Sequence, residues 1–224
     1  ASDVYKRQLK NLLSIPVVST WTSKDLMAQG DPLFVGNFGL LGERAANFTI
    51  QQADLLLILG SRMSIPNTGY RTDLFSPNSK KIMVDIDSNE MFKHTINIDY
   101  SVNDDLKNFF PRIISAIKND NTLPDWNEWV SIAHQWKEKY PVFQEEYSRI
   151  PSKINSFYFM EVLSRKLRDN HVVVTDMGTS YTCTMQSLQM NGKNRLFTSS
   201  ATCSMGFGLP GAIGAVSYTH LTLP

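Results

Sequence analysis

Apolar runs alternate with amphipathic stretches along the first half of the chain, and this order predicts strands that alternate with helices. Two amphipathic stretches, residues 43–53 and 104–118, predict helices, and Pro111 must either kink the second helix or mark its true start. Residues 9–120 are therefore predicted to form a doubly wound α/β domain with a parallel sheet. The runs typical of strands inside such a sheet are residues 15–20, 54–60 and 81–87.

The pattern changes from about residue 120, and residues 123–141 predict a polar helix with an aromatic stripe. Trp126, Trp129 and Trp136 fall near helical spacing on it. Such a stripe can form an aromatic ligand box, but it more often holds a helix against a domain surface. We therefore interpret residues 121–151 as a linker helix region.

A second α/β unit is predicted over residues 152–216. This unit has few strands, so we interpret it as a truncated second α/β domain. The apolar faces of residues 172–174 and of Phe197 are then expected to be exposed. The predicted helices are residues 157–168, 179–189 and 206–215, and the predicted strands are residues 171–176 and 195–199.

Both ends of the sequence differ in character from the rest. Residues 1–8 and 217–224 resemble translated adapter sequence, although a natural terminus and a natural tail are the alternative. We leave both ends out of the fold prediction, as one would leave out a cloning scar.

Composition adds few functional constraints. A net charge of +1 gives no electrostatic reason to expect nucleic acid or an acidic membrane as partner. Two cysteines suit a reducing compartment, and no apolar run approaches the roughly 18 residues that a membrane span needs, so a cytoplasmic location is expected. His94, His134 and His171 have no second ligand at metal spacing, and we predict no metal site.

Two glycine-containing turns follow the strands of the second unit: Asp176–Gly178 and Ser199–Gly206. Ligands of open parallel sheets bind at the carboxyl ends of the strands, so the two turns can line one crevice. Each turn by itself is equally consistent with an ordinary connection between a strand and a helix.

The segment Ser204-Met-Gly-Phe-Gly-Leu-Pro210, within residues 198–215, resembles the cofactor loop and following helix of thiamine-diphosphate enzymes, especially the acetolactate synthase group. The resemblance implies that the Cys203 carbonyl accepts a hydrogen bond from the aminopyrimidine amine. It implies that the Met205 N–H donates to a ring nitrogen, while the Met205 side chain holds the cofactor bent. Gly178, Thr179 and Gly206 complete the predicted thiamine-diphosphate residues.

The segment also departs from the acetolactate synthase pattern. Ser200, Ala201 and Cys203 stand where relatives have a run of glycines. Thr179 and Ser180 replace the Gln-His that acetolactate synthases favour after Gly178. The substrate therefore stays open.

Residues 10–118 resemble the middle domain of the same family, through the stretch Pro32-Leu-Phe-Val-Gly-Asn-Phe-Gly-Leu-Leu-Gly-Glu-Arg-Ala-Ala-Asn47. In acetolactate synthases this domain holds FAD in a structural role, and many relatives have an altered site. FAD binding stays open, because Leu41 stands where flavin-binding members have a histidine. The glycines can instead serve a tight loop, and Arg62 can instead pair with Asp85 or Asp54. The residues that the resemblance places near FAD are Gly39, Gly42, Arg62, Asp87 and Asp104.

The resemblance implies an enzyme that decarboxylates a 2-oxo acid and transfers the carbanion equivalent to an acceptor, in branched-chain amino acid biosynthesis, as a homodimer or tetramer. The activating glutamate is expected before residue 1, and the segment that binds Mg²⁺ and diphosphate after residue 224. No catalytic residue is therefore predicted in this chain, and no turnover by the chain alone. Another thiamine-diphosphate decarboxylase or lyase, a non-catalytic dinucleotide-binding module and a fragment without ligand are the alternatives.

Overall fold

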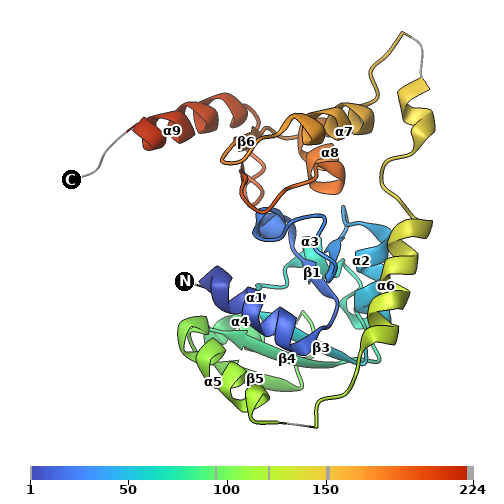
Figure 1. Cartoon of the computed structure of the whole chain (residues 1–224). Helices are drawn as coiled ribbons and strands as arrows, with labels where there is room; N and C mark the ends of the chain where they lie inside the picture. Colours follow the sequence, from blue (N-terminus) through green and yellow to red (C-terminus); the bar gives the residue numbers. More distant parts are fainter. Residues whose placement is uncertain (1, 94, 121, 150–151, 221–224) are drawn as a thin grey trace.

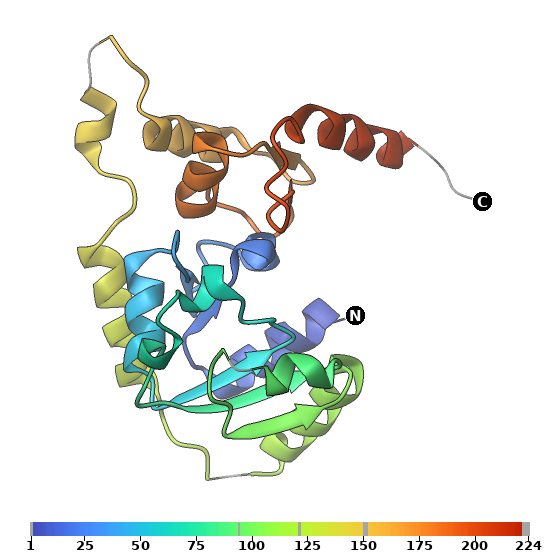
Figure 2. The same cartoon turned by 180° about the vertical axis from the view of Figure 1, so that it is seen from behind.

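The computed structural model describes residues 2–93, 95–120, 122–149 and 152–220. Two α/β units lie one above the other in Figure 1, and helix α6 (Asn127–Lys139) runs along the side of the first unit before the chain enters the second. Figure 2 shows the same arrangement from behind. The α/β class with parallel strands is the one expected from the sequence.

The strands of the first unit pair in parallel, as predicted, but they form two sheets rather than one. Two of them, β2 (Phe34–Asn37) and β5 (Tyr100–Asn103), were not predicted, because β2 contains a glycine and β5 is largely polar and exposed. One sheet is β1 (Val17–Ser19) with β2 (Phe34–Asn37), and the other is β3 (Leu55–Leu59), β4 (Lys80–Asp85) and β5 (Tyr100–Asn103) in that order.

Helices flank both sheets of the first unit. Helix α5 begins after Asp105, whose carboxylate accepts from the Lys107 N–H at 2.8 Å. Pro111 lies inside α5, so the alternative that the helix begins there is wrong. The helical segments are α1 (Ser2–Leu13), η1 (Trp21–Leu26), α2 (Arg44–Gln52), α3 (Ile65–Thr68), η2 (Thr72–Leu74), α4 (Ser88–Phe92) and α5 (Leu106–Lys118).

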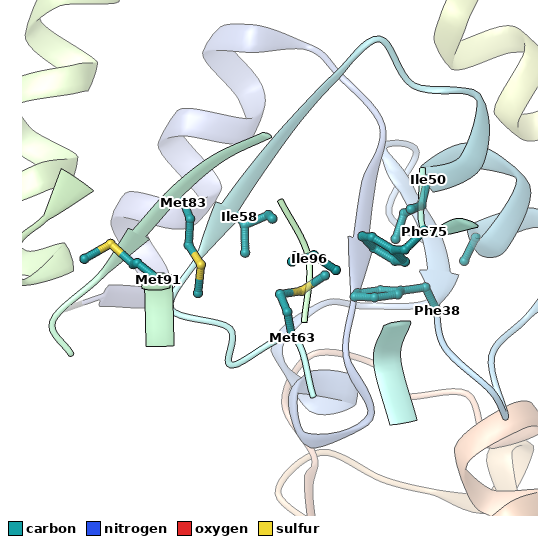
Figure 3. Close-up of a cluster of buried hydrophobic side chains, with 9 residues drawn as sticks. Phe38, Ile50, Ile58, Met63, Phe75, Met83, Met91 and Ile96 are labelled. Atoms are coloured by element: carbon teal, nitrogen blue, oxygen red, sulfur yellow. The ribbon is translucent and has the colours of Figure 1, made fainter. Parts of the chain in front are cut away.

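The three-stranded sheet has a separate apolar cluster on each face. On one face, shown in Figure 3, Ile58 and Met83 of the sheet pack with Phe38, Ile50 and other residues from α2, α4 and the connecting loops. On the other face, partly buried leucines of β3 pack with α1 and α5 around Phe110, Ile114 and Ile117. Helices on both faces of a parallel sheet are the doubly wound arrangement that the sequence predicts.

Helix α1 includes residues 2–8, which the sequence analysis set aside. Tyr5 stacks on the fully buried Phe110 with ring centroids 6.4 Å apart, and Leu9 is 4% exposed. Lys10 forms an ion pair with Asp31. These contacts show that α1 packs as part of the first unit, whatever the origin of its first residues.

Helix α6 packs on α2 through aromatic rings. The ring of Phe48 lies 5.9 Å from Trp136 and 5.4 Å from Tyr140, and Trp129 lies 5.6 Å from Trp136, all edge to face. Such pairs add about 0.5–1.5 kcal/mol each beyond the area that they bury. This packing agrees with the interpretation of a helix held to the domain surface by its aromatic residues.

The second unit has a two-stranded parallel sheet, β6 (Val172–Thr175) with β7 (Arg195–Thr198). Val172 and Phe197 are 39% and 44% exposed, as expected for a sheet with few strands. Helix α9 (Gly208–His220) extends away from the rest of the molecule in both views. The remaining helical segments are η3 (Glu145–Arg149), α7 (Ser156–Lys166) and α8 (Thr179–Ser187).

Within the described residues, none of the helices combines the length and apolar character that crossing a bilayer requires.

Candidate functional site

The carboxylate of Asp176 joins the two glycine-containing turns of the second unit. Its Oδ1 accepts from the N–H groups of Met177 at 2.7 Å and of Gly206 at 2.9 Å, and its Oδ2 accepts from the Gly208 N–H at 2.9 Å. The N–H groups of Gly208, Met177 and Gly206 lower the pKa of this carboxyl, so it is ionised at neutral pH. The two turns therefore meet at one end of the β6–β7 sheet.

The predicted cofactor loop is open to solvent. Met205 is 90% exposed, and Cys203 is exposed in a left-handed backbone conformation with φ of 51°. Gly178 precedes α8 with φ of 80°, and a Cβ placed there or at Gly206 would meet no atom within 4 Å. The backbone at both turns thus leaves room for a ligand to approach closely.

Two buried hydroxyls belong to the elements that carry these turns. In the part of the chain that the structure describes, the Tyr181 hydroxyl on α8 and Thr198 Oγ1 at the end of β7 have no hydrogen-bond partner. Burial and the nearby Cys203 raise the pKa of Tyr181 to about 12, which keeps the phenol neutral at physiological pH. Sequence reasoning named the Asp176–Gly178 turn but gave no role to the Asp176 side chain, because Gly206 and Gly208, which donate to it, lie 30 and 32 positions later. It did not single out Tyr181 either.

The charged residues predicted near FAD have partners within the chain. Arg62 pairs with Glu90 at 2.8 Å, so the alternative pairing with Asp85 or Asp54 is wrong. Asp87 accepts from the Asn89 N–H at 2.9 Å and caps α4. Asp104 forms an ion pair with Arg112. Arg62, Asp87 and Asp104 follow the carboxyl ends of β3, β4 and β5. Because these strands are parallel, the three residues lie toward the same end of the sheet.

Lys93 also contacts Glu90, at 2.5 Å. The hydrogen bond from Lys93, together with that from Arg62, lowers the pKa of Glu90, so the carboxylate stays ionised between the two cations.

The glycines of the predicted dinucleotide loop are explained by the packing of the loop itself. Gly39 has φ of 119°, and a Cβ there would lie 2.5 Å from the Pro66 carbonyl oxygen. A Cβ at Gly42 would lie 2.6 Å from the Gly39 nitrogen. The Asn47 side chain accepts from the Gly39 N–H at 2.9 Å and donates to the Gly39 carbonyl at 3.1 Å, which fixes the loop.

A buried polar cluster lies beside this loop. Lys24, 2% exposed, donates to Asn37 Oδ1 at 3.0 Å, and Glu43 Oε1 accepts from the Asn37 N–H at 3.1 Å. Desolvation lowers the pKa of Lys24 to about 8, against the opposing effect of Glu43. Desolvation likewise raises the pKa of Glu43.

Two clefts lie outside the predicted sites. One, of about 440 Å³, lies between the units, and the other, of about 400 Å³, lies beside α4 and β5. Neither is lined by a residue predicted to bind thiamine diphosphate or FAD.

His134 and His171 form hydrogen bonds with backbone groups. His134 Nε2 contacts the Pro32 carbonyl, and His171 Nδ1 accepts from the Arg168 N–H at 3.1 Å. His94 lies outside the described residues. Across residues 2–93, 95–120, 122–149 and 152–220, no three His, Cys, Asp or Glu side chains gather as a metal would require.

Comparison with known proteins gives a consistent set of relatives. The family described as thiamine pyrophosphate enzyme, central domain, matches residues 6–113. Over 93% of its length the chain is 31% identical to the acetolactate synthase large subunits of Cyanidium caldarium and Parasynechococcus marenigrum, and 28% identical to the acetolactate synthase isozyme 1 large subunit of Escherichia coli. The matches cover 35%, 33% and 36% of these relatives, so the chain spans about a third of their length.

The family match agrees with the parallel α/β architecture of the first unit. The resemblance to this family stated from the sequence is thereby confirmed. We conclude that residues 6–113 match the central domain of thiamine pyrophosphate enzymes, and that the chain is similar over 93% of its length to acetolactate synthase large subunits.

Proposed function

We propose that this chain is part of a thiamine-diphosphate-dependent enzyme of the acetolactate synthase type. The whole enzyme would decarboxylate a 2-oxo acid and transfer the resulting carbanion equivalent to an acceptor. The observation that carries the proposal is the junction of the two turns at Asp176, which sets the Cys203–Gly206 loop beside the start of α8. The similarity to acetolactate synthase large subunits supports the same conclusion.

The residues present fit the aminopyrimidine and thiazolium part of thiamine diphosphate. Gly178 and Gly206 leave open space at the turns, and the exposed loop offers the Cys203 carbonyl and the Met205 N–H as acceptor and donor. When bound, the cofactor supplies an electron sink for the decarboxylation of a 2-oxo acid. This chain's contribution is to hold the ring system and to orient it against the apolar Met205 side chain.

The diphosphate and Mg²⁺ would be held by residues outside this chain. We propose that the acetolactate-synthase-like parent supplies them, together with the glutamate that activates the aminopyrimidine, in a cytoplasmic homodimer or tetramer. Branched-chain amino acid biosynthesis is the corresponding biological role.

The loop can be tested by nuclear magnetic resonance on the ¹⁵N-labelled full chain. Thiamine and thiamine diphosphate should both shift the backbone amides of Cys203 and Met205, because both carry the aminopyrimidine. Inorganic pyrophosphate, which shares only the anionic part, should leave these amides in place. Shifts confined to other regions, or equal shifts with pyrophosphate, would overturn the proposed site.

A non-catalytic dinucleotide-binding module is the second candidate. It is favoured by the position of Arg62, Asp87 and Asp104 after the carboxyl ends of the three parallel strands. All three already have partners in the chain, so FAD would have to displace the Arg62–Glu90 and Arg112–Asp104 pairs. Flavin absorbance of the small molecule released from purified full chain tests this candidate. A stoichiometric flavin supports it, and a colourless folded protein that also ignores added FAD rejects it.

A further inference from the structure

Asp176 forms the long-range hydrogen bonds of the segment between β7 and α9. Its carboxylate accepts from residues 30 and 32 positions later, Gly206 and Gly208. The other hydrogen bonds of residues 199–206 that the structure describes join residues within this loop, such as Cys203 N–H to the Ser199 carbonyl at 2.7 Å. Asp176 therefore ties an otherwise locally bonded loop to the end of the neighbouring strand.

Glycine at position 208 permits this tie. A Cβ there would lie 3.1 Å from Asp176 Oδ2 and 3.2 Å from Asp176 Cβ, closer than ordinary contacts. The carboxylate also bonds Met177 next to it, so one side chain fixes both the approach to α8 and the start of α9.

The bond to Gly206 acts directly on Met205. The Gly206 N–H and the Met205 carbonyl belong to the same planar peptide unit, so holding the N–H fixes the orientation of that plane. A charge-assisted bond of this kind is stronger than a neutral one. The Met205 backbone is thereby set relative to Asp176, which begins the turn that contains Gly178.

We infer that Asp176 is a positioning residue, which holds the Cys203–Gly206 loop in the conformation that receives the aminopyrimidine. The inference rests on the proposed function for its ligand. The hydrogen bonds themselves can be tested without any ligand.

Amide hydrogen exchange on the full chain tests the tie. Asp176→Asn should reduce the protection of the Gly206 and Gly208 amides by about tenfold or more, while the β6 and β7 amides keep theirs. Asp169→Asn, which removes an exposed carboxylate paired with Lys193 in the same unit, should leave the loop unchanged. Unchanged protection of Gly206 and Gly208 in Asp176→Asn would overturn the inference.

A second pair of variants covers the case in which Asp176→Asn does not fold. Gly208→Ala places a methyl group against the Asp176 carboxylate and should lower protection at Gly206 and Gly208. Gly214→Ala lies on the same helix with no atom within 4 Å of the added Cβ, and it should have no such effect. Equal protection in the two variants would contradict the proposed tie.

The ligand arm separates this inference from the proposed function. If the tie acts on the site, thiamine should shift the Cys203 and Met205 amides in the wild type and in Gly214→Ala, but much less in Gly208→Ala. Loss of protection together with wild-type thiamine shifts would overturn the positioning role. Absence of thiamine shifts in the wild type, with the tie present, would reject the proposed function instead.

Discussion

Asp25 and Arg195, 170 positions apart, connect the two units of the molecule. Asp25 Oδ2 accepts from Arg195 Nε at 2.8 Å and from the Leu196 N–H of β7 at 3.1 Å. The Asp25 side chain is only 7% exposed, so water cannot readily replace it. Two further contacts join the same two units. The Trp21 and Tyr181 rings pack edge to face, and the Gln29 N–H donates to the Met190 carbonyl at 2.8 Å.

Asp25→Asn should therefore weaken the connection between the units. The variant loses a charge-assisted bond at a largely buried site, and we expect the free energy of unfolding to fall by about 1–3 kcal/mol in urea titrations. Asp169→Asn, at the exposed pair with Lys193, should change it by under about 1 kcal/mol. Equal effects of the two variants would show that the Asp25 contact does not hold the units together.

The buried Lys24 should make stability depend on pH. Its pKa is about 8 in the folded chain and 10.5 as its ordinary value, so between these values the unfolded chain binds a proton that the folded chain lacks. Stability therefore rises with pH across this window. Glu43 and Lys137 are the charged groups that act on Lys24, and Asn37 accepts its hydrogen bond.

The corresponding measurement is urea unfolding at about pH 8, 9 and 10. Lys24→Met should remove the part of the rise that Lys24 causes. Lys80→Met, an exposed lysine at the start of β4, should follow the wild type. A rise of wild-type size in Lys24→Met would exclude Lys24 as its source.

The strands that the sequence predicted are those whose apolar side chains form a continuous run. β2 was missed because its four buried positions include Gly36 and Asn37, and Asn37 is buried through hydrogen bonds with Lys24 and Ser19 rather than by apolar packing. The sequence located the two turns of the second unit but not Asp176 as their connection. Its partners lie 30 and 32 positions away, at a distance that no local pattern can indicate.

Gly39→Ala should destabilise the first unit whether or not a dinucleotide binds. The new Cβ would meet the Pro66 carbonyl at 2.5 Å in a backbone conformation that L-residues rarely adopt. Strain and overpacking together predict a loss of at least about 2 kcal/mol in urea unfolding. Gly30→Ala has free space around its Cβ and should stay within about 0.5 kcal/mol of the wild type. A neutral Gly39→Ala would reopen the dinucleotide explanation for this glycine.

Purified residues 1–224 should show no turnover with thiamine diphosphate, Mg²⁺ and a 2-oxo acid. The chain covers about a third of its relatives, and under the proposed function the activating glutamate and the metal-binding residues are supplied by the rest of the enzyme. The measurement is carbon dioxide release and formation of the carboligation product, with the Escherichia coli isozyme 1 large subunit as a working control for the assay. Turnover by this chain above a no-protein blank would refute the division of roles proposed here.

Tyr5→Ala tests whether residues 2–8 contribute to the fold. The variant removes a ring stacked on the buried Phe110 at 6.4 Å, so we expect a loss of about 1–3 kcal/mol in urea unfolding. Val4→Ala is the matched control on the same helix, because Val4 is 58% exposed and should change stability by less than about 0.5 kcal/mol. If both variants unfold like the wild type, α1 does not stabilise the first unit through Tyr5. A loss of stability confined to Tyr5→Ala means instead that the segment resembling adapter sequence packs as part of the domain. The stability of the first unit then depends on the contact between Tyr5 and Phe110 of α5.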